Sequence, residues 1–430
     1  MLKPVAGFAA FGLFWGAWGA ILPAVRTGAG VNDGELGVAL LMIGLGALVS
    51  MRFTGYLIDR YGGVVLPVVT GLFAICGVLP ALAGSVLTLS AALLLLGATS
   101  GAMDVAVNAT GSHAEAATER PVMNLAHGMF SVAVVVASLG TAGLRAAGVG
   151  ALPVLGGAGA LIVITALVLL AQRDTTNSNN THHAPTTPAG GGRDAQASAS
   201  GGGRDAQPAA AGGVRDLPGD GGGSGAGRGR LEPALLMFGV LCAIAYLVEN
   251  AWQSWSAVHL DTSLHAPAGL ASIAPAVFAA AAATGRFAGN ALLKRVRQVQ
   301  LLVMGGIIAA VGSLVAATAN HTWIALVGIG VAGLGTSVCA PTIIGMAGAW
   351  AGPQRRAGAI SVVTTIAYLG FLIGPAAVGA VSSQWSLPVA LGSVAVLAVL
   401  VAGLAPVAGR IAGAGLRRTE TGLRRTEKGI

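Results

Sequence analysis

The sequence has few charged residues and only three cysteines. Of its 430 residues, 9% are charged and 54% are hydrophobic, whereas a soluble globular domain carries about 25% charged residues. So few charges cannot cover the surface of a water-soluble protein of this size, which excludes an ordinary cytosolic enzyme. Three cysteines scattered through apolar runs also exclude a disulfide-stabilised secreted module. The composition predicts an α-helical protein that crosses a membrane many times.

Motifs for chemistry and for nucleic-acid binding are also absent. The sequence contains no Gly-x-x-x-x-Gly-Lys-Ser/Thr phosphate loop, no cluster of His, Asp and Glu at metal-ligand spacing and no nucleophile elbow. The net charge is +8, but the basic residues lie in loops and tails rather than on one face. We therefore expect no catalytic residue, no metal, no cofactor, no ATP motor and no nucleic-acid partner.

Long hydrophobic runs dominate the rest of the chain. A membrane-spanning helix needs about 20 mostly apolar residues, and the 67 glycines suit close packing of such helices. The predicted spans are 5–25, 36–58, 64–84, 88–111, 122–145, 151–171, 234–258, 268–292, 299–318, 322–348, 358–383 and 386–409. These runs predict an all-α membrane protein with twelve transmembrane helices in two six-helix bundles.

The two bundles are separated by low-complexity sequence. Residues 172–231 are rich in Gly, Pro, Ser and Ala, and they contain Gly-Gly-Arg-Asp-Ala-Gln at 191–196 and again at 202–207. Such sequence cannot bury enough apolar area to fold, so we expect a disordered linker. The predicted domains are a first bundle at 1–171, the linker at 172–231, a second bundle at 232–410 and a basic tail at 411–430.

Lys and Arg in short loops predict the orientation. With the amino terminus inside, the outer segments hold only Arg26 and Arg145. The inner segments hold Lys3, Arg60, Arg120, Lys294, Arg295, Arg297, Arg355 and Arg356. Both termini, the linker and the tail are therefore predicted to be cytoplasmic.

An internal repeat connects the two bundles. Arg52-Phe53-Thr54-Gly55 ends the second span, and Arg286-Phe287-Ala288-Gly289 ends the eighth, 234 residues later (286 minus 52). Each motif leads into a short basic loop. Two parallel six-helix halves that bind a solute between them are a known transporter plan.

Residues 55–63, Gly-Tyr-Leu-Ile-Asp-Arg-Tyr-Gly-Gly, resemble the loop signature of the major facilitator superfamily. The resemblance implies alternating access, with a gating motif of Arg52, Gly55, Asp59, Arg60, Arg286 and Gly289. In that motif Asp59 pairs with Arg60 or with a basic group across the interface and holds the inner gate closed. The alternative is that Arg60 only anchors the topology. Gly63 and Lys294 depart from the family pattern, which weakens the expected charge lock, particularly in the second half.

Three further blocks, at 103–108, 127–131 and 368–375, resemble a bacterial permease branch near the fucose permeases. This resemblance implies a multi-pass protein of the bacterial cytoplasmic (inner) membrane that takes up a small polar solute such as a sugar.

Polar residues inside the predicted spans are the candidates for solute or proton binding. A charged side chain within a bilayer is costly, so it usually faces an interior cavity and has a function. Asp104 and Glu249 are such acids, and an amide residue follows each at i+4, on the same helix face. The candidate site residues are Trp15, Asp104, Asn108, His127, Glu249, Asn250, Trp252 and Gln253. For each acid and for His127 the alternative is a structural bond to a neighbouring helix, and for Trp15 it is packing or lipid contact.

These observations favour a monomeric secondary transporter that is coupled to protons through Asp104 or Glu249. Its partners would be a small-molecule substrate, protons and the lipid bilayer. Two alternatives remain open. One is export of an amphipathic drug or antibiotic, which the tryptophans and buried acids would suit. The other is a membrane sensor or scaffold that does not transport.

Overall fold

The computed structural model describes residues 2–118, 122–180, 232–352 and 355–427, and within these ranges it contains helices and no strand. The first half comprises α1 (Leu2–Ala29), α2 (Asp33–Tyr61), η1 (Gly62–Val64), α3 (Val65–Val78), η2 (Leu79–Leu82), α4 (Val86–Thr118), α5 (Val122–Ala146) and α6 (Ala151–Asn180). The second half comprises α7 (Pro233–Thr262), α8 (Ala268–Ala271), α9 (Ala274–Leu292), α10 (Gln298–Thr318), α11 (Thr322–Thr336), α12 (Cys339–Ala351), α13 (Arg356–Gln384) and α14 (Leu387–Glu427).

The helices agree with twelve membrane crossings. Eleven segments are long and apolar enough to cross, and one of them, Asp33–Leu82, has 50 residues, about twice what one crossing needs. It consists of α2 and α3, separated at Gly62, whose φ of 57° is readily adopted only by glycine. This segment therefore supplies two crossings, whereas α11 and α12 together form a single crossing, Thr322–Ala351.

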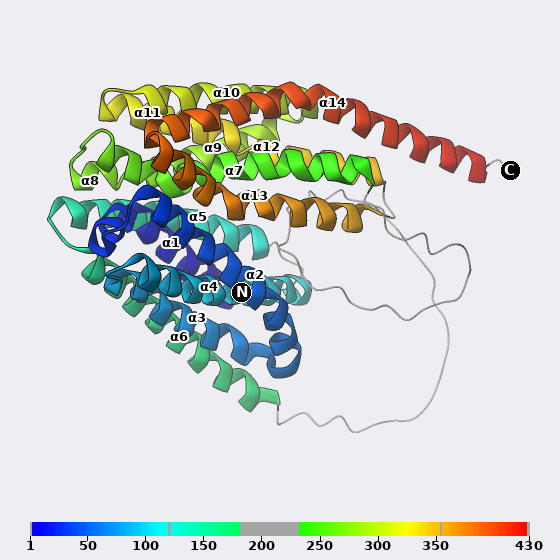
Figure 1. Ribbon diagram of the computed structural model, residues 1–430. Coiled ribbons are helices and arrows are strands. Elements are labelled where there is room, and N and C mark those ends of the chain that lie inside the picture. The colour runs from blue at the N-terminus through cyan, green and yellow to red at the C-terminus, as the bar shows by residue number, and fades with distance from the viewer. Residues whose placement is uncertain (1, 119–121, 181–231, 353–354, 428–430) are drawn as a thin grey trace, which may run out of the picture.

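The two halves repeat one packing pattern (Figure 1). In the first half α1 packs on α5, α2 on α4 and α3 on α6. In the second half the corresponding pairs are α7 with α13, α9 with α11 and α10 with α14. The same order of contacts in both halves confirms the prediction of two pseudo-symmetric bundles.

Glycine allows the helices within a bundle to approach closely. A Cβ added to Gly12 of α1 would lie 2.3 Å from the carbonyl oxygen of Phe130 on α5, and one added to Gly16 would lie 2.3 Å from that of Val134. The Ser138 hydroxyl donates a 2.8 Å bond to the Gly16 carbonyl at the same contact. This is the small-xxx-small arrangement by which membrane helices pack without a hydrophobic driving force.

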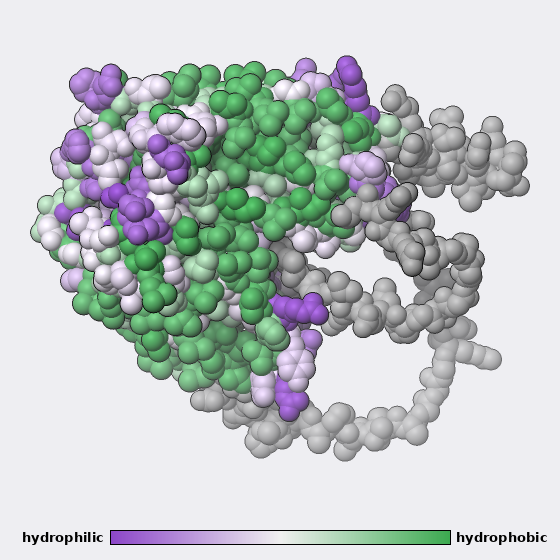
Figure 2. All heavy atoms as spheres, in the orientation of Figure 1, coloured by the Kyte–Doolittle hydropathy of each residue, from purple (hydrophilic) through white to green (hydrophobic). Residues whose placement is uncertain are grey.

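The outer surface is apolar around the middle of the molecule. Figure 2 shows hydrophobic residues over most of the face in view, with hydrophilic residues gathered toward its ends. Large hydrophobic side chains such as Leu161, Ile164, Val327 and Val396 are exposed on this outer surface. A soluble protein does not expose so much apolar area, but a lipid bilayer covers it.

Two helices continue beyond the predicted spans. The α6 helix extends to Asn180, into the segment expected to begin the linker, and α14 extends to Glu427, through most of the expected tail. Both helices pass into polar sequence that hydropathy does not mark as a span. The remainder of the predicted linker, residues 181–231, lies outside the described residues.

The two bundles contact each other at one end, which we call the closed end. It contains the end of α1, the start of α2, the ends of α5, α7 and α13, and α8, and it lies at the left of Figure 1. There Gly37 of α2 and Gly379 of α13 meet backbone to backbone, and the Ser272 hydroxyl donates a 2.8 Å bond to the Ala20 carbonyl. We call the opposite end, which contains the start of α1 and the ends of α2 and α14, the open end.

Candidate functional site

Glu249 is part of a charged cluster near the middle of α7. The side chain of Arg286 on α9 pairs with the Glu249 carboxylate at 2.8 Å, and Gln253 donates a 3.2 Å bond to the same oxygen. The Glu249 side chain is 8% exposed and that of Arg286 is 45% exposed. The buried Glu249 carboxylate is thus paired with an Arg286 guanidinium that is partly exposed.

Asp104 forms a second polar group on α4. Asn108, one turn later, donates bonds to the Asp104 carboxylate at 3.0 Å and to its carbonyl oxygen at 2.9 Å. Both side chains are half-buried. In the part of the chain that the structure describes, Asp104 has no ion pair, so its carboxylate has an amide partner but no basic partner.

His127 on α5 lies between aromatic packing and the charged cluster. Its ring stands 4.4 Å from that of Phe8 on α1, centroid to centroid. Arg286, in the other bundle, lies close enough to His127 for its charge to act on the imidazole. The charge of Asp104 likewise acts on the phenol group of Tyr368, which lies on α13.

The electrostatic influence of Arg286 on His127 and of Asp104 on Tyr368 indicates that polar groups of both bundles lie near the interface between them. Asp104 and His127 come from the first bundle, and Glu249, Arg286 and Tyr368 come from the second. Asp104 and Glu249 each lie near the middle of their helix, between the closed end and the open end. The arrangement offers acids, an amide, an imidazole, a guanidinium and a phenol to a solute that enters between the bundles.

Two predicted site residues take up structural roles. The Trp252 ring is fully buried, and its Nε1 donates a 2.8 Å bond to the Ser313 hydroxyl on α10, inside the second bundle. Asn250 is also buried, and it donates to the Phe371 carbonyl on α13 while its Oδ1 accepts from Ser254. In this structure these side chains join α7 to its neighbours, and a contact with solute stays a prediction for both.

Trp15 keeps part of its surface accessible on α1. Its ring makes edge contacts with Phe11 and Phe14 at 6.2 Å and 5.7 Å between centroids. Trp18, one turn further on, is buried and stacks on Phe14. Of this pair, only Trp15 retains surface that a solute could contact.

The gating motif of the first half lies exposed at the open end. Arg52, Asp59 and Arg60 are all exposed, and none of them has an ion pair among the described residues. Arg60 instead lies over the Tyr61 ring, 5.7 Å from its centroid. A Cβ added to Gly55 would meet nothing within 4 Å, so no other helix packs closely against this glycine in this conformation.

The motif of the second half is built differently. A Cβ on Gly289 would lie 2.6 Å from Val338, between α11 and α12 of the same bundle. Arg286, predicted to belong to the gate, reaches Glu249 instead. Neither this pair nor the position of Tyr368 follows from the sequence, although Tyr368 begins one of the blocks that carry the resemblance.

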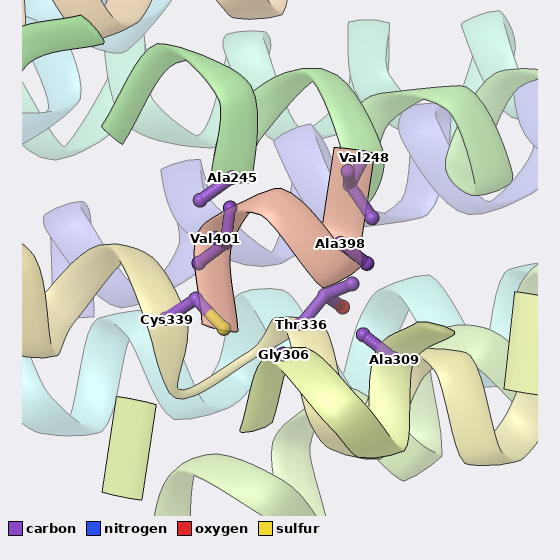
Figure 3. Close-up of a pocket in the computed structure, with 8 residues that line it drawn as sticks. All are labelled: Ala245, Val248, Gly306, Ala309, Thr336, Cys339, Ala398 and Val401. Atoms are coloured by element: carbon purple, nitrogen blue, oxygen red, sulfur yellow. The ribbon is translucent and has the colours of Figure 1, made fainter. Parts of the chain in front are cut away.

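A small pocket inside the second bundle is separate from this cluster. It has a volume of about 10 Å³ and is lined by residues of α7, α10, α11, α12 and α14, including Val248, Thr336 and Cys339 (Figure 3). That is room for about one water molecule. Among the described residues no group of three His, Cys, Asp or Glu could hold a metal ion.

Comparisons with known proteins point to one transporter family. The model of the Major Facilitator Superfamily matches residues 234–418. An uncharacterized MFS-type transporter of Yersinia pestis is 29% identical over 396 residues, 91% of each chain. The second half of the chain thus matches the major facilitator superfamily, and along 91% of its length the chain is similar to an MFS-type transporter. These matches support a multi-pass membrane transporter rather than an enzyme.

Other relatives and solved structures match along most of the chain. An uncharacterized transporter of Sinorhizobium fredii is 28% identical, over 94% of this chain and 96% of its own. A bacterial homologue of the human lysosomal transporter Spinster, in an inward-facing and occupied conformation, aligns with a TM-score of 0.71 at 15% identity, over 95% of this chain and 96% of its own. The nucleoside transporter NupG aligns with a TM-score of 0.65 at 12% identity, over 96% of this chain and 97% of its own. These structures share the fold.

Proposed function

We propose that this protein carries a small polar solute across the bacterial cytoplasmic membrane by proton-coupled alternating access, with both termini in the cytoplasm. The solute would bind between Asp104 and Asn108 on one side and Glu249, Gln253 and Arg286 on the other. The single observation that carries the proposal is the position of this polar cluster. It lies near the interface of the two bundles, away from the closed end, and the side chains of Arg286 and Gln253 in it are exposed.

Asp104 is the better candidate for the proton carrier. Glu249 already has a positive partner in Arg286, whereas Asp104 has no basic partner among the described residues. An uncompensated charge within a membrane is costly. Binding a proton would remove that charge before the bundles close around the site, and losing it afterwards would complete the cycle.

The chemistry of the cluster favours a solute with several hydroxyl groups. Carboxylates, amides and the guanidinium provide acceptors and donors on both sides, and Trp15 on α1 keeps part of its ring accessible. A D-xylose–proton symporter shares the fold, with a TM-score of 0.63. The resemblance to the fucose-permease branch supports the same class of substrate.

Export of an amphipathic cation is the second candidate. The observation that favours it is the unpaired Asp104 carboxylate, because a cationic amine would supply the missing positive charge. The two candidates differ in what they require of the solute: the first needs hydroxyl groups and no net charge, whereas the second needs a positive charge.

A thermal-shift screen of the purified protein in detergent tests both candidates. A ligand at about 100 times its Kd stabilises the folded state by roughly 2.7 kcal/mol, so sugars and other polar metabolites are compared with aromatic cations. We expect a hit among the sugars that is lost in Glu249→Gln and kept in Asp104→Asn, whose amide still offers a donor and an acceptor. Glu232→Gln is the matched control, because Glu232 also pairs with an arginine at 2.8 Å but is exposed. A hit among the cations would refute the sugar proposal.

Cell-based transport then separates a transporter from a sensor or scaffold. Strains producing wild type, Asp104→Asn or Glu249→Gln at equal levels are compared for uptake or export of the compound found in the screen. We expect both variants to lose proton-driven transport. An unchanged phenotype in both would favour a scaffold.

A further inference from the structure

Asp33 joins three helices at the closed end. It is the first residue of α2, and its Oδ1 lies 2.8 Å from Arg26 Nη2 on α1. Its other oxygen, Oδ2, accepts a hydrogen bond from the Ser382 hydroxyl on α13. Arg26 and Asp33 belong to the first bundle and Ser382 to the second, so one carboxylate connects the two bundles.

The two contacts of Asp33 differ in kind. The contact with Arg26 is an ion pair without hydrogen-bond alignment, since Oδ1 is buried and has no hydrogen-bond partner. The contact with Ser382 is a hydrogen bond to a charged acceptor, a class that is stronger than neutral bonds. The Asp33 and Arg26 side chains are 17% and 22% exposed. Arg26 thus balances the charge of Asp33, while Ser382 supplies the directional contact.

The surrounding residues hold Asp33 in place. Asn32 and Glu35 form a reciprocal capping box, with bonds of 2.9 Å in both directions, which fixes the start of α2. One turn further on, the backbones of Gly37 and Gly379 meet. The charge of Arg26 also acts electrostatically on the Asp261 carboxylate of α7. Arg26 therefore keeps an acidic neighbour if Asp33 loses its charge.

We propose that the Ser382–Asp33 hydrogen bond is the latch that keeps this end of the transporter closed, and that it breaks each time this end opens. The inference rests on the alternating access proposed above. Opening this end must separate α2 from α13, and this separation breaks the bond to Ser382 but leaves the Arg26–Asp33 pair within one bundle. Asp33 therefore acts as a positioning residue that sets how often the site faces this side.

The rate at which a cysteine in the site is labelled from the closed side measures opening directly. Gln253→Cys is placed in a chain whose three native cysteines have been replaced, because Gln253 is exposed beside Glu249. A membrane-impermeant thiol reagent is applied to right-side-out and to inside-out vesicles. The slower side is the closed side, and its labelling rate reports even a rarely populated open state.

Two variants and two matched controls are compared on this background. Ser382→Ala removes the donor and Asp33→Asn removes the charged acceptor. A bond to a charged group is worth enough that its loss shifts the population about tenfold, so we expect labelling from the closed side to be about ten times faster. Ser383→Ala and Glu35→Gln should leave it unchanged, because these side chains bond only within their own helix region.

The outcomes separate the two proposals. Unchanged labelling in both Ser382→Ala and Asp33→Asn would overturn the latch. Faster labelling in the controls as well would also overturn it, because the effect would then not be specific to this bond. If the cysteine is never labelled from the slow side, even in wild type, alternating access itself is wrong. Ser382→Ala keeps the Arg26–Asp33 pair, so this variant tests the latch even if Asp33→Asn does not fold.

Discussion

Two glycines on α13 should respond in opposite ways to the same substitution by alanine. A Cβ at Gly370 would lie 1.9 Å from the Ala243 carbonyl oxygen on α7, within the second bundle. A Cβ at Gly379 would lie 2.5 Å from the Asp33 carbonyl oxygen of the other bundle. We expect Gly370→Ala to reduce the stability of the fold and Gly379→Ala to change the conformation.

The size of the effect follows from how far each neighbour must move. Ordinary van der Waals contact begins at 3.4 Å, so the backbone must yield by 1.5 Å at Gly370 (3.4 minus 1.9) and by 0.9 Å at Gly379 (3.4 minus 2.5). Overpacking of this kind costs about 1–3 kcal/mol. At Gly370 every conformation bears that cost, because α7 and α13 are paired within one bundle. We therefore expect the free energy of unfolding to fall by about 2–3 kcal/mol, the upper part of that range.

At Gly379 only the closed conformation bears the cost. Separating α2 from α13 at this end relieves the collision. Rigid-body movement of the two bundles would produce this separation. A penalty of about 1–3 kcal/mol then becomes a population shift of about 5- to 150-fold toward the state open at this end. Thermal unfolding in detergent and closed-side labelling of the Gln253→Cys reporter measure the two effects separately. Gly403→Ala on α14, where an added Cβ meets nothing within 4 Å, is the control.

One result would refute this reasoning. If Gly379→Ala lowers the unfolding temperature as much as Gly370→Ala does and leaves labelling unchanged, the bundles do not separate at the Gly37–Gly379 contact. The closed end would then be a permanent part of the fold rather than a gate.

Three further substitutions test the site. Glu249→Gln should abolish proton-coupled transport in proteoliposomes while lowering the free energy of unfolding by less than about 1 kcal/mol, because the partner Arg286 is 45% exposed and stays solvated; full proton-driven transport would contradict this. Asp104→Asn should still exchange solute across the membrane, but a pH gradient should no longer accelerate it; persistent acceleration would rule out Asp104 as the proton carrier. Trp252→Phe should lower the free energy of unfolding by about 1–3 kcal/mol, since Ser313 loses its buried donor, with solute affinity unchanged; weaker binding at unchanged stability would restore Trp252 to the site.

Hydrophobic run length was sufficient to predict the fold, because a bilayer sets a minimum length for each apolar helix. Hydropathy could not locate the ends of α6 and α14, which continue into polar sequence. The segment Gly-Leu-Arg-Arg-Thr-Glu at 415–420 is unsuited to a membrane span, yet Leu, Arg and Glu favour a helix in water. A helix can therefore extend beyond its apolar part, so the end of a membrane span does not mark the end of the helix.

The site was only partly predictable, for a geometric reason. Bonds between Asp104 and Asn108 and between Glu249 and Gln253 follow from the i, i+4 spacing. The Glu249–Arg286 pair joins residues 37 apart, and it depends on how α7 and α9 are placed in space. The orientation of the Trp252 side chain was equally unpredictable. A helix that is apolar on every side gives no signal of which face turns toward the bundle core.

The structure also explains why the two repeated motifs should differ in function. Gly289 is already covered by Val338 of its own bundle, and Arg286 is paired with Glu249. Gly55 has open space around it, and Asp59 is exposed. The sequence departs from the family pattern in the same half, with Lys294 where an acid is common. We therefore propose that the gating role belongs to the first motif and that the second motif presents Arg286 to the site.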